Sequence, residues 1–190
     1  MANVKKILFL FNSDYGQANV NLSTIYSLTE TLAQAGETVE LHVGTFENLK
    51  PMFDEMIELI KDTLHATRHI IFHPIVGTSQ FEAMKRPELG VYETFHLPLP
   101  SYENASRFLR QFPSSAIPWE DQELCSMYDQ LKTVVEKVQP DLTVIDPLLV
   151  PATTLAKQLN LKWTVLAPNT MKDFCILQQP WLAGMWKYPM

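Results

Sequence analysis

Residues 7–17 read ILFLFNSDYGQ, and this stretch decides the fold class. Its first five residues are all apolar and do not alternate with polar ones, which is typical of a strand buried on both faces of a sheet. The polar run Asn12-Ser13-Asp14 ends the strand. Strands of this kind belong to parallel sheets that carry helices on both faces, so the sequence predicts an α/β protein.

The rest of the chain alternates between helix and strand patterns. Apolar side chains spaced three and four residues apart predict helices, and short apolar runs predict further buried strands. The predicted helices cover residues 22–35, 49–64, 101–112, 124–138 and 151–159, and the predicted strands cover residues 39–43, 70–72, 142–145 and 163–166. This order predicts an open, mostly parallel, Rossmann-like sheet with right-handed crossovers and helices on both faces.

We expect residues 1–169 to form one domain and residues 170–190 to form an apolar tail. The tail is rich in Met, Trp and Tyr and has few charges. We therefore expect it to dock on another domain, on a second copy of the chain or on a membrane surface. Residues 74–100 carry turn residues and no helical period, which predicts a long irregular segment with a short strand around residues 91–95.

Composition and charge narrow the class of partner. The chain has 190 residues, of which 46% are hydrophobic and 19% are charged, so intrinsic disorder is excluded. Its net charge is −6, and no basic stripe is present to neutralise phosphates, which argues against a nucleic acid partner. The chain has only two Cys, which suits a reducing compartment, and it shows neither a signal-peptide pattern nor an apolar run of about 20 residues. We therefore expect a cytoplasmic protein.

The edge of the sheet where the strands end is the expected binding site, because ligands of open α/β sheets lie beyond the carboxyl ends of the strands. The residues that follow the predicted strands are 12–17, 73–78, 146–147 and 167–169. Asp146 directly follows an apolar strand. We expect it to face the loop that carries Asp14 and Gln17.

Several common site motifs are absent. The six Gly residues are scattered, so the sequence has neither a dinucleotide fingerprint nor a phosphate-binding loop. Gly-x-Ser-x-Gly is absent as well, which sets serine-hydrolase chemistry aside. His65, His69 and His73 are four residues apart, but a strand between the last two would splay them, so we expect no metal site.

The order and spacing of several motifs resemble a known family. These motifs are Gly16-Gln17, LxxxLAxxGxxV at residues 28–39, PDLxVID at residues 140–146 and AxxLxL at residues 156–161. Together they resemble the N-terminal half of the UDP-glycosyltransferases, enzymes with two Rossmann-like domains (the GT-B fold). QPW at residues 179–181 and WKYP at residues 186–189 look similar to fungal members of the UDP-glucosyltransferase family.

The resemblance implies the acceptor-binding half of an enzyme that transfers a hexose, with inversion, from a UDP-sugar to a hydroxyl of a small or lipid-like acceptor. We expect the half that would bind the UDP-sugar to lie outside these 190 residues, and we expect this chain alone to bind no cofactor and to be inactive. Family members use a His as the base and an Asp to support it. These positions correspond here to Gln17 and Asp146, which are the candidate catalytic residues.

Gln17 changes the expected chemistry, because an amide does not accept a proton at neutral pH. Three interpretations stay open. Asp146 or Asp14 acts as the base, the acceptor has an acidic hydroxyl, or the chain performs no chemistry and Gln17 only hydrogen-bonds the acceptor. Direct action by an Asp requires a desolvated site that raises the pKa of its carboxyl group.

The candidate acceptor-binding residues come from the strand ends and from aromatic side chains between residues 74 and 119. These aromatic side chains either line a site for a lipid or aromatic acceptor or belong to the core. The candidates are Ser13, Asp14, Tyr15, Gly16, His73, Phe95, Trp119 and Asn169.

Two other functions are consistent with the residues. The first is a non-catalytic module that binds a hydrophobic small molecule, which the amide of Gln17 favours. The second is a flavodoxin-like FMN carrier, because residues 13–17 occupy the position of an FMN phosphate loop. Ala18 and the low Ser and Thr content of that loop suit a phosphate poorly.

Overall fold

The computed structural model describes residues 4–61, 70–91 and 101–168. These residues form a five-stranded parallel sheet built from β1 (Lys5–Leu10), β2 (Val39–Phe46), β3 (Ile70–Ile75), β4 (Leu142–Ile145) and β5 (Trp163–Val165). The strand order is β3-β2-β1-β4-β5, with β1 in the centre. The open parallel α/β sheet expected from the sequence is therefore confirmed.

The β1 strand occupies the centre because both of its faces are apolar. Leu8 and Leu10 pack into the core on one side of the sheet, and Phe9 belongs with Phe11 to the core on the other side. All four side chains are at most 1% exposed. Removing each of them from water stabilises the fold by about 1.5–3 kcal/mol.

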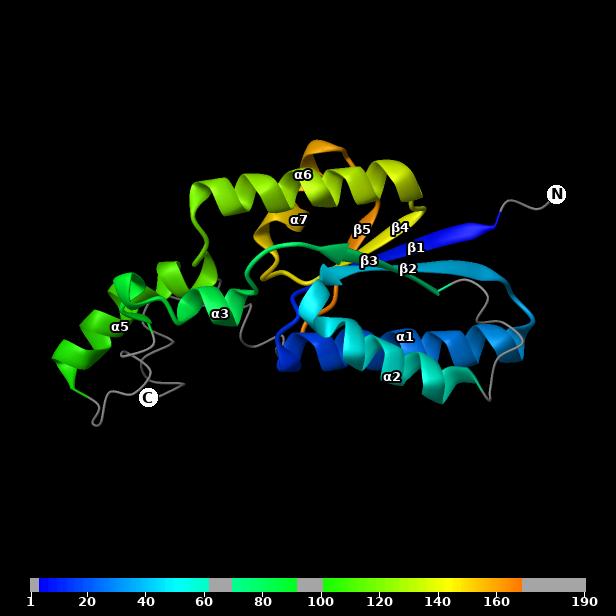
Figure 1. Cartoon of the computed structure of the whole chain (residues 1–190), viewed down its shortest axis with the longest axis horizontal. Helices are drawn as coiled ribbons and strands as arrows, with labels where there is room; N and C mark the ends of the chain where they lie inside the picture. The colour runs from blue at the N-terminus through cyan, green and yellow to red at the C-terminus, as the bar shows by residue number, and fades with distance from the viewer. Residues whose placement is uncertain (1–3, 62–69, 92–100, 169–190) are drawn as a thin grey trace, which may run out of the picture.

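Two pairs of helices cover the two faces of the sheet (Figure 1). The first pair is α1 (Tyr15–Ala35) and α2 (Lys50–Lys61), which follows the short turn η1 (Glu47–Leu49). The second pair is α6 (Asp121–Val138) and α7 (Val150–Gln158). None of the helices in the described ranges is both long enough and apolar enough to span a bilayer.

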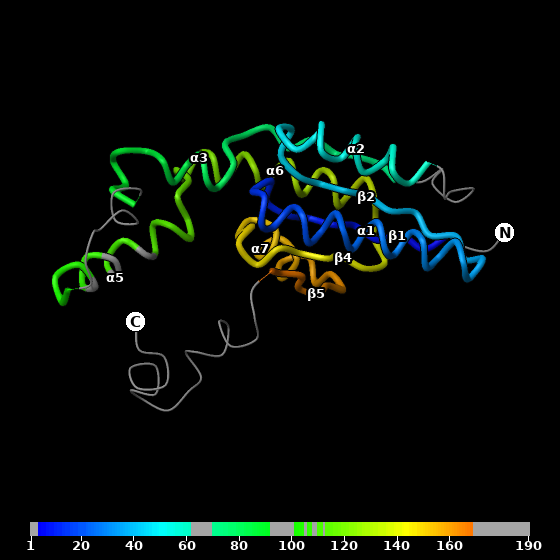
Figure 2. The backbone as a smooth tube through the Cα atoms, turned by 90° about the horizontal axis from the view of Figure 1, so that it is seen from below, coloured from blue at the N-terminus to red at the C-terminus, as the bar shows by residue number. Residues whose placement is uncertain are grey.

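An arm of short helices leaves the sheet at the edge where the strands end (Figures 1 and 2). It contains α3 (Gln80–Met84), the turn η3 (Pro87–Leu89) and α5 (Tyr102–Ala116). The expectation of a segment without helices at residues 74–100 is wrong for α3 and η3, which are too short to show a period. Val91 is helical rather than extended, and residues 92–95 lie outside the described residues.

The β3 strand is longer than expected. It extends to Ile75, so His73 and Pro74 lie within the strand instead of in the loop after it. Pro74 has no N–H to contribute to a ladder. It is tolerated because β3 is an edge strand of the described sheet and pairs there with β2.

A bidentate ion pair ties the arm to α6. The Arg86 guanidinium donates to both carboxylate oxygens of Glu123, at 2.8 and 2.6 Å. The Thr78 hydroxyl also donates to Glu123 (3.2 Å), and the Trp119 ring N–H donates to the Thr78 carbonyl (2.7 Å). The hydrogen bond from Arg86 is the largest of the influences that lower the pKa of Glu123 to about 2.

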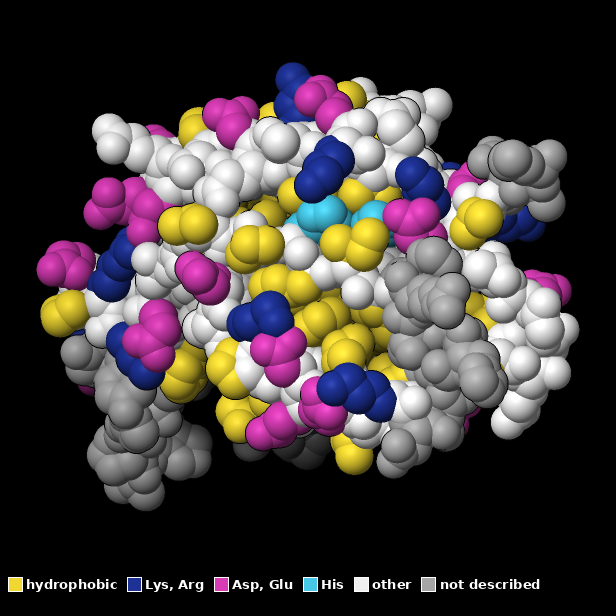
Figure 3. Space-filling model, turned by 45° about the vertical axis from the view of Figure 1, so that its right-hand side comes forward, with side chains coloured by type: hydrophobic (Ala, Val, Ile, Leu, Met, Phe, Trp, Pro, Cys, Tyr) yellow, Lys and Arg dark blue, Asp and Glu magenta, His cyan; other side chains and the backbone are white. Residues whose placement is uncertain are grey.

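A pair of buried imidazoles lies where β2 meets β3. His42 Nδ1 and His73 Nε2 are 2.9 Å apart, and the two rings stack with their centroids 5.2 Å apart. Figure 3 shows histidine side chains on one face of the molecule, close to basic and acidic side chains. Burial and the neighbouring His42 lower the pKa of His73 to about 4, and burial also lowers the pKa of His42. The fold therefore favours the neutral form of both rings.

Glu123→Gln should lower the free energy of unfolding at neutral pH, and the loss should be smaller at acidic pH. The fold favours the Glu123 carboxylate, so its stabilisation is complete above the ordinary pKa of 4.5 and is lost as the pH falls towards 2. We expect a loss of about 1 kcal/mol at pH 7, measured by urea unfolding, and a smaller loss at pH 3.5. Glu136→Gln is the control, because Glu136 is exposed and 3.9 Å from Lys132. Equal losses in both variants would contradict the prediction.

His73→Gln should reduce the acid sensitivity of the fold. The unfolded chain binds a proton at His73 near pH 6.5, whereas the folded protein does so only near pH 4. The free energy of unfolding therefore falls as the pH is lowered through this window, by up to about 1.4 kcal/mol per pH unit. Urea midpoints at pH 7.5 and pH 5 should differ more for the native chain than for His73→Gln. If the two differences are equal, His73 does not carry the effect.

Candidate functional site

The loops after β1 and β4 meet at the edge where the strands end. Asp146, which follows β4, is fully buried. Its Oδ2 accepts the backbone N–H (3.1 Å) and the side-chain amide (3.2 Å) of Asn12, and its Oδ1 accepts the Leu148 N–H (2.9 Å). Burial raises the pKa of Asp146, although these hydrogen bonds offset part of the rise. One carboxylate therefore fastens the two loops together.

Asn12 extends this network into the arm. Its side-chain amide also donates to Gln80 Oε1 (3.2 Å), and Gln80 Nε2 donates to the backbone carbonyls of Ser115 (3.1 Å) and Ala116 (3.4 Å). Asn12 and Gln80 are both buried. The position of α3 and of the end of α5 therefore depends on side chains that meet at the centre of the sheet edge.

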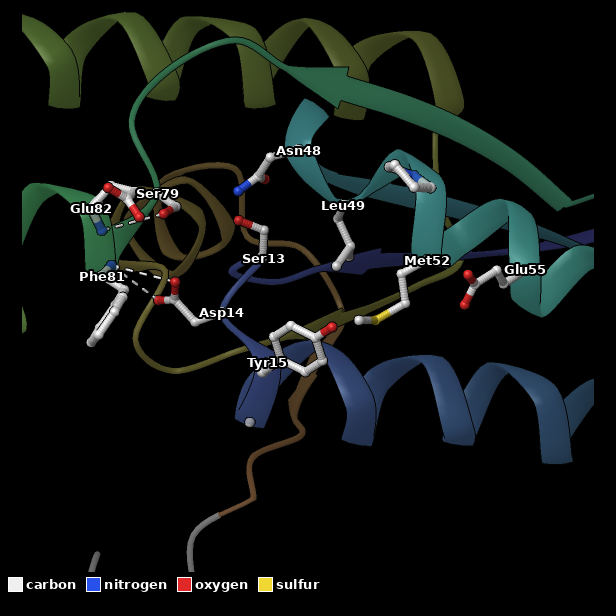
Figure 4. A pocket seen from close by; sticks show the side chains of 12 residues that line it. Ser13, Asp14, Tyr15, Asn48, Leu49, Met52, Glu55, Ser79, Phe81 and Glu82 are labelled. Carbon is white, nitrogen blue, oxygen red and sulfur yellow. Dashed lines mark hydrogen bonds between the residues drawn. The ribbon is translucent and has the colours of Figure 1, made fainter.

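A cleft of about 610 Å³ opens beside this network. Its walls come from three segments, namely the loop after β1 with the start of α1, the turn η1 with α2, and the start of α3 (Figure 4). The first wall contributes Ser13, Asp14, Tyr15 and Gly16, the second contributes Asn48, Leu49, Pro51, Met52 and Glu55, and the third contributes Ser79, Phe81 and Glu82. The cleft combines apolar and polar groups, as sites for small molecules do.

Asp14 places a carboxylate between the loop and the arm. It occupies the N-cap position of α1, but its side chain does not cap that helix. The carboxylate instead accepts the Phe81 N–H, at 3.2 and 3.4 Å from its two oxygens (Figure 4). Burial raises the pKa of Asp14, and the charge of Asp146 raises it further, whereas the Phe81 N–H and the Ser79 hydroxyl offset part of the rise. The cleft therefore holds a carboxylate of enhanced basicity.

Ser13 adds an unused hydroxyl to the same wall. Its side chain lines the cleft although the residue is only 8% exposed. Within the described part of the chain, the Ser13 hydroxyl has no hydrogen-bond partner. A buried hydroxyl without a partner costs free energy, so this atom is suited to bind a polar atom of a ligand.

The structure brings some of the candidate acceptor-binding residues to the cleft and places others elsewhere. Residues 13–16 line the cleft. His73 is buried inside the sheet because β3 continues past it, and Trp119 is buried with its ring N–H bound to a backbone carbonyl. Their burial gives both side chains structural contacts away from this cleft, and their role as acceptor contacts stays a prediction. Phe95 and Asn169 lie outside the described residues.

Neither candidate catalytic residue lines the cleft. Asp146 is fully buried and accepts the Asn12 N–H, so its contacts support a positioning role, and its assignment as a catalytic residue stays a prediction. Gln17 lies in the first turn of α1 and is half-buried. Among the described residues, its side-chain oxygen has no hydrogen-bond partner. Asp146 influences the cleft in a second way, through the charge that raises the pKa of Asp14.

The wall formed by η1 and α2 was not expected from the sequence. Asn48, Met52 and Glu55 belong to it, and they follow β2 in the chain. No loop residues had been proposed after that strand. The rule that ligands bind beyond the carboxyl ends of parallel strands applies to β2 as well, and it would have identified this segment.

The geometry does not favour a metal centre or a phosphate site. Among residues 4–61, 70–91 and 101–168, no three His, Cys, Asp or Glu side chains come together as metal ligands would. The residues that line the cleft include three carboxylates and no Lys or Arg. The N-cap residue of α1, Asp14, brings a negative charge close to the helix start where a phosphate would bind, which disfavours a phosphate there. The interpretation as an FMN carrier therefore gains no support.

Comparison with known sequences identifies a fungal relative. No protein-family model matches the chain. The chain is 28% identical over 191 residues to the glycosyltransferase sdnJ of Sordaria araneosa. The match covers 96% of this chain and 36% of that protein, so the chain spans about a third of the length of its relative.

Solved glycosyltransferases share the fold. SnogD from Streptomyces nogalater matches with a TM-score of 0.54 at 13% identity, over 88% of this chain and 35% of that one. SsfS6 from Streptomyces sp. SF2575 matches with a TM-score of 0.53 at 17% identity, over 85% of this chain and 38% of that one. At these identities the likeness concerns the fold alone. Together with the fungal relative, these matches confirm the resemblance of the chain to the N-terminal half of a GT-B glycosyltransferase.

Proposed function

We propose that the chain is the acceptor-binding part of a glycosyltransferase that transfers a hexose, with inversion, from a UDP-sugar to a hydroxyl group. The observation that carries the proposal is the cleft at the sheet edge, which holds the Asp14 carboxylate beside the Ser13 hydroxyl, a group without a partner among the described residues. An acceptor alcohol needs a proton acceptor within hydrogen-bond reach of its reacting oxygen. The mixed apolar and polar walls suit a small or lipid-like acceptor.

The nucleotide sugar belongs, in this proposal, to another part of the enzyme. The cleft itself offers a diphosphate no cationic side chain. SsfS6 has been solved in complex with thymidine diphosphate, which supports a nucleoside diphosphate sugar as the kind of donor. We place the protein in the cytoplasm, with residues 170–190 in contact with a membrane surface when the acceptor is a lipid.

Asp14 is the group best placed to take the acceptor proton. Gln17 carries an amide and does not line the cleft, and Asp146 is fully buried. Asp14 lines the cleft, and burial raises its pKa, which makes the carboxylate a better base than an exposed Asp. Of the interpretations left open by the sequence, direct action by Asp14 therefore has the most support.

The proposed reaction is a direct displacement. The acceptor O–H bond breaks as the proton passes to an oxygen of Asp14, and the acceptor oxygen forms a bond to the anomeric carbon of the sugar. The bond between that carbon and the phosphate oxygen breaks, and its electron pair leaves with the nucleoside diphosphate. Attack from the side opposite the leaving group inverts the anomeric centre. The Ser13 hydroxyl hydrogen-bonds the acceptor and orients it.

Transfer is tested with the protein expressed from its complete coding sequence, so that any segment beyond residue 190 is included. UDP-glucose is supplied with a panel of aliphatic, aromatic and steroid alcohols, and mass spectrometry detects products that gain one hexose. Transfer to at least one alcohol is the expected result. Binding of both substrates without transfer would favour the non-catalytic module instead, an alternative that the comparisons do not favour.

Asp14→Asn should lower kcat by at least about 100-fold, because general-base catalysis contributes about that much. The Asn side chain keeps the shape and can still accept the Phe81 N–H, but it takes no proton. Asp129→Asn is the matched control, since Asp129 is exposed on α6, and it should keep the native rate. Native activity in Asp14→Asn would remove Asp14 from the mechanism.

Asp146→Asn should shift the pH dependence of kcat/KM as well as lower its maximum. The charge of Asp146 raises the pKa of Asp14, so removing that charge lets Asp14 ionise at a lower pH. The acid limb of the profile should therefore move to lower pH, while the disturbed contact with Asn12 reduces the rate at every pH. If kcat/KM falls but the acid limb of its pH profile does not move, Asp146 acts only by positioning Asn12 and not through its charge on Asp14.

A further inference from the structure

The charged side chains that line the cleft have a single sign. Asp14, Glu55 and Glu82 are acidic, and none of the lining residues is Lys or Arg. They stand on three different walls, since Asp14 precedes α1, Glu55 belongs to α2 and Glu82 belongs to α3 (Figure 4). A ligand in the cleft therefore meets negative charge on each side.

Two of these carboxylates are already engaged. The Asp14 carboxylate accepts the Phe81 N–H, and Glu82 pairs with Lys85 at 2.7 Å. These contacts offset part of the charge of both carboxylates.

Glu55 is the least compensated of the three. The two cations of α2 pair with other acids on the same helix, Lys50 with Asp54 and Lys61 with Glu58. Within the described residues, Glu55 has no recorded ion pair, and its side chain extends from α2 on the side that faces α1 (Figure 4). In the described part of the chain, Glu55 therefore presents an unpaired negative charge to the outer part of the cleft.

The same cleft shows an independent sign of a ligand. The Ser13 hydroxyl is buried in its lining and has no partner in the described part of the chain. Between Ser13 and Glu55 lie apolar side chains, among them Leu49 and Met52. The arrangement provides a polar contact at the inner end, an apolar wall along α2 and a negative charge further out.

We infer that the cleft accepts molecules whose groups near α2 are neutral or positively charged, and that Glu55 is the residue that rejects carboxylates and other anions. The inference rests on the proposed function and names the substrate class of the same site. That class is an apolar skeleton with a hydroxyl directed to Asp14 and Ser13, and with an amine or a further hydroxyl near Glu55.

The physical reason is electrostatic. An anion that enters a partly desolvated cleft lined by carboxylates loses hydration and is repelled by like charges, whereas an ammonium group is attracted. Rejection of this kind separates acceptors of equal size and shape, which apolar contacts alone discriminate poorly. Glu55 thus determines specificity without taking part in proton transfer.

The test uses three naphthalenemethanols that differ only in a second group on the far ring: a hydroxymethyl group (the alcohol), an aminomethyl group (the amine) or a carboxylate (the naphthoate). Binding to the protein expressed from its complete coding sequence is measured by equilibrium dialysis at neutral pH and low salt. The alcohol and the amine should bind, and naphthoate should bind at least about tenfold more weakly than the alcohol. In Glu55→Gln, naphthoate should approach the alcohol to within about threefold, and the amine should lose affinity.

Two further variants make the result specific. Glu58→Gln removes an acid one turn along α2 that does not line the cleft, and it should leave the ratio of the three affinities unchanged. Gly16→Trp places a ring at the cleft, where an added Cβ meets no atom within 4 Å, and it should abolish binding of all probes.

The outcomes distinguish a failure of the charge selection by Glu55 from a failure of the cleft as the acceptor site. If the alcohol and amine bind and Gly16→Trp blocks them, but naphthoate binds equally well or Glu55→Gln leaves the ratios unchanged, the charge selection is wrong and the acceptor cleft stands. If no probe binds, or if Gly16→Trp has no effect on binding, the assignment of this cleft as the acceptor site is wrong, and the inference falls with it.

Discussion

The contact between the Asp146 carboxylate and Asn12 is the constraint on which the site depends. A carboxylate that is fully buried is costly unless donors surround it, and here the Asn12 backbone, the Asn12 side chain and the Leu148 N–H supply three hydrogen bonds. Two of these come from Asn12, the second residue after the end of the central strand, so they fix the course of the loop after β1. That course sets where the Ser13 and Asp14 side chains stand.

The same constraint reaches the arm. Asn12 donates to Gln80, and Gln80 donates to carbonyls at the end of α5, so the short helices beyond the sheet are fixed to the centre of its edge. Once α3 is fixed, the Phe81 N–H faces the Asp14 carboxylate. An isolated five-residue helix has little stability of its own, and its place here is determined by tertiary hydrogen bonds instead. The cleft is therefore a product of contacts between segments far apart in the chain.

Because the cleft arises from contacts between distant segments, the sequence predicted the strands and long helices better than it predicted the site. The strand at residues 7–11 and the long helices depend on apolar periodicity, which is local, and Asp146 was found because the ends of parallel strands share one edge. The burial of Asp146 and its contact with Asn12 depend on the packing of two loops, which periodicity does not report. His73 was expected in a loop because the predicted strand was limited to the apolar run at residues 70–72, whereas the edge strand continues to Ile75. Glu55 was missed because it is an ordinary exposed acid until α2 is placed beside α1.

The amide at Gln17 is consistent with a base at Asp14. The two residues share the first turn of α1, where the Gln17 N–H donates to the Asp14 carbonyl (3.0 Å). A residue that gained positive charge at position 17 would favour the ionised Asp14 and lower its pKa, which would make the carboxylate a weaker base. An uncharged amide leaves burial and the charge of Asp146 as the main influences that raise the pKa of Asp14. In the proposed mechanism, an uncharged side chain at position 17 and a carboxylate of raised pKa at Asp14 thus belong to the same electrostatic arrangement.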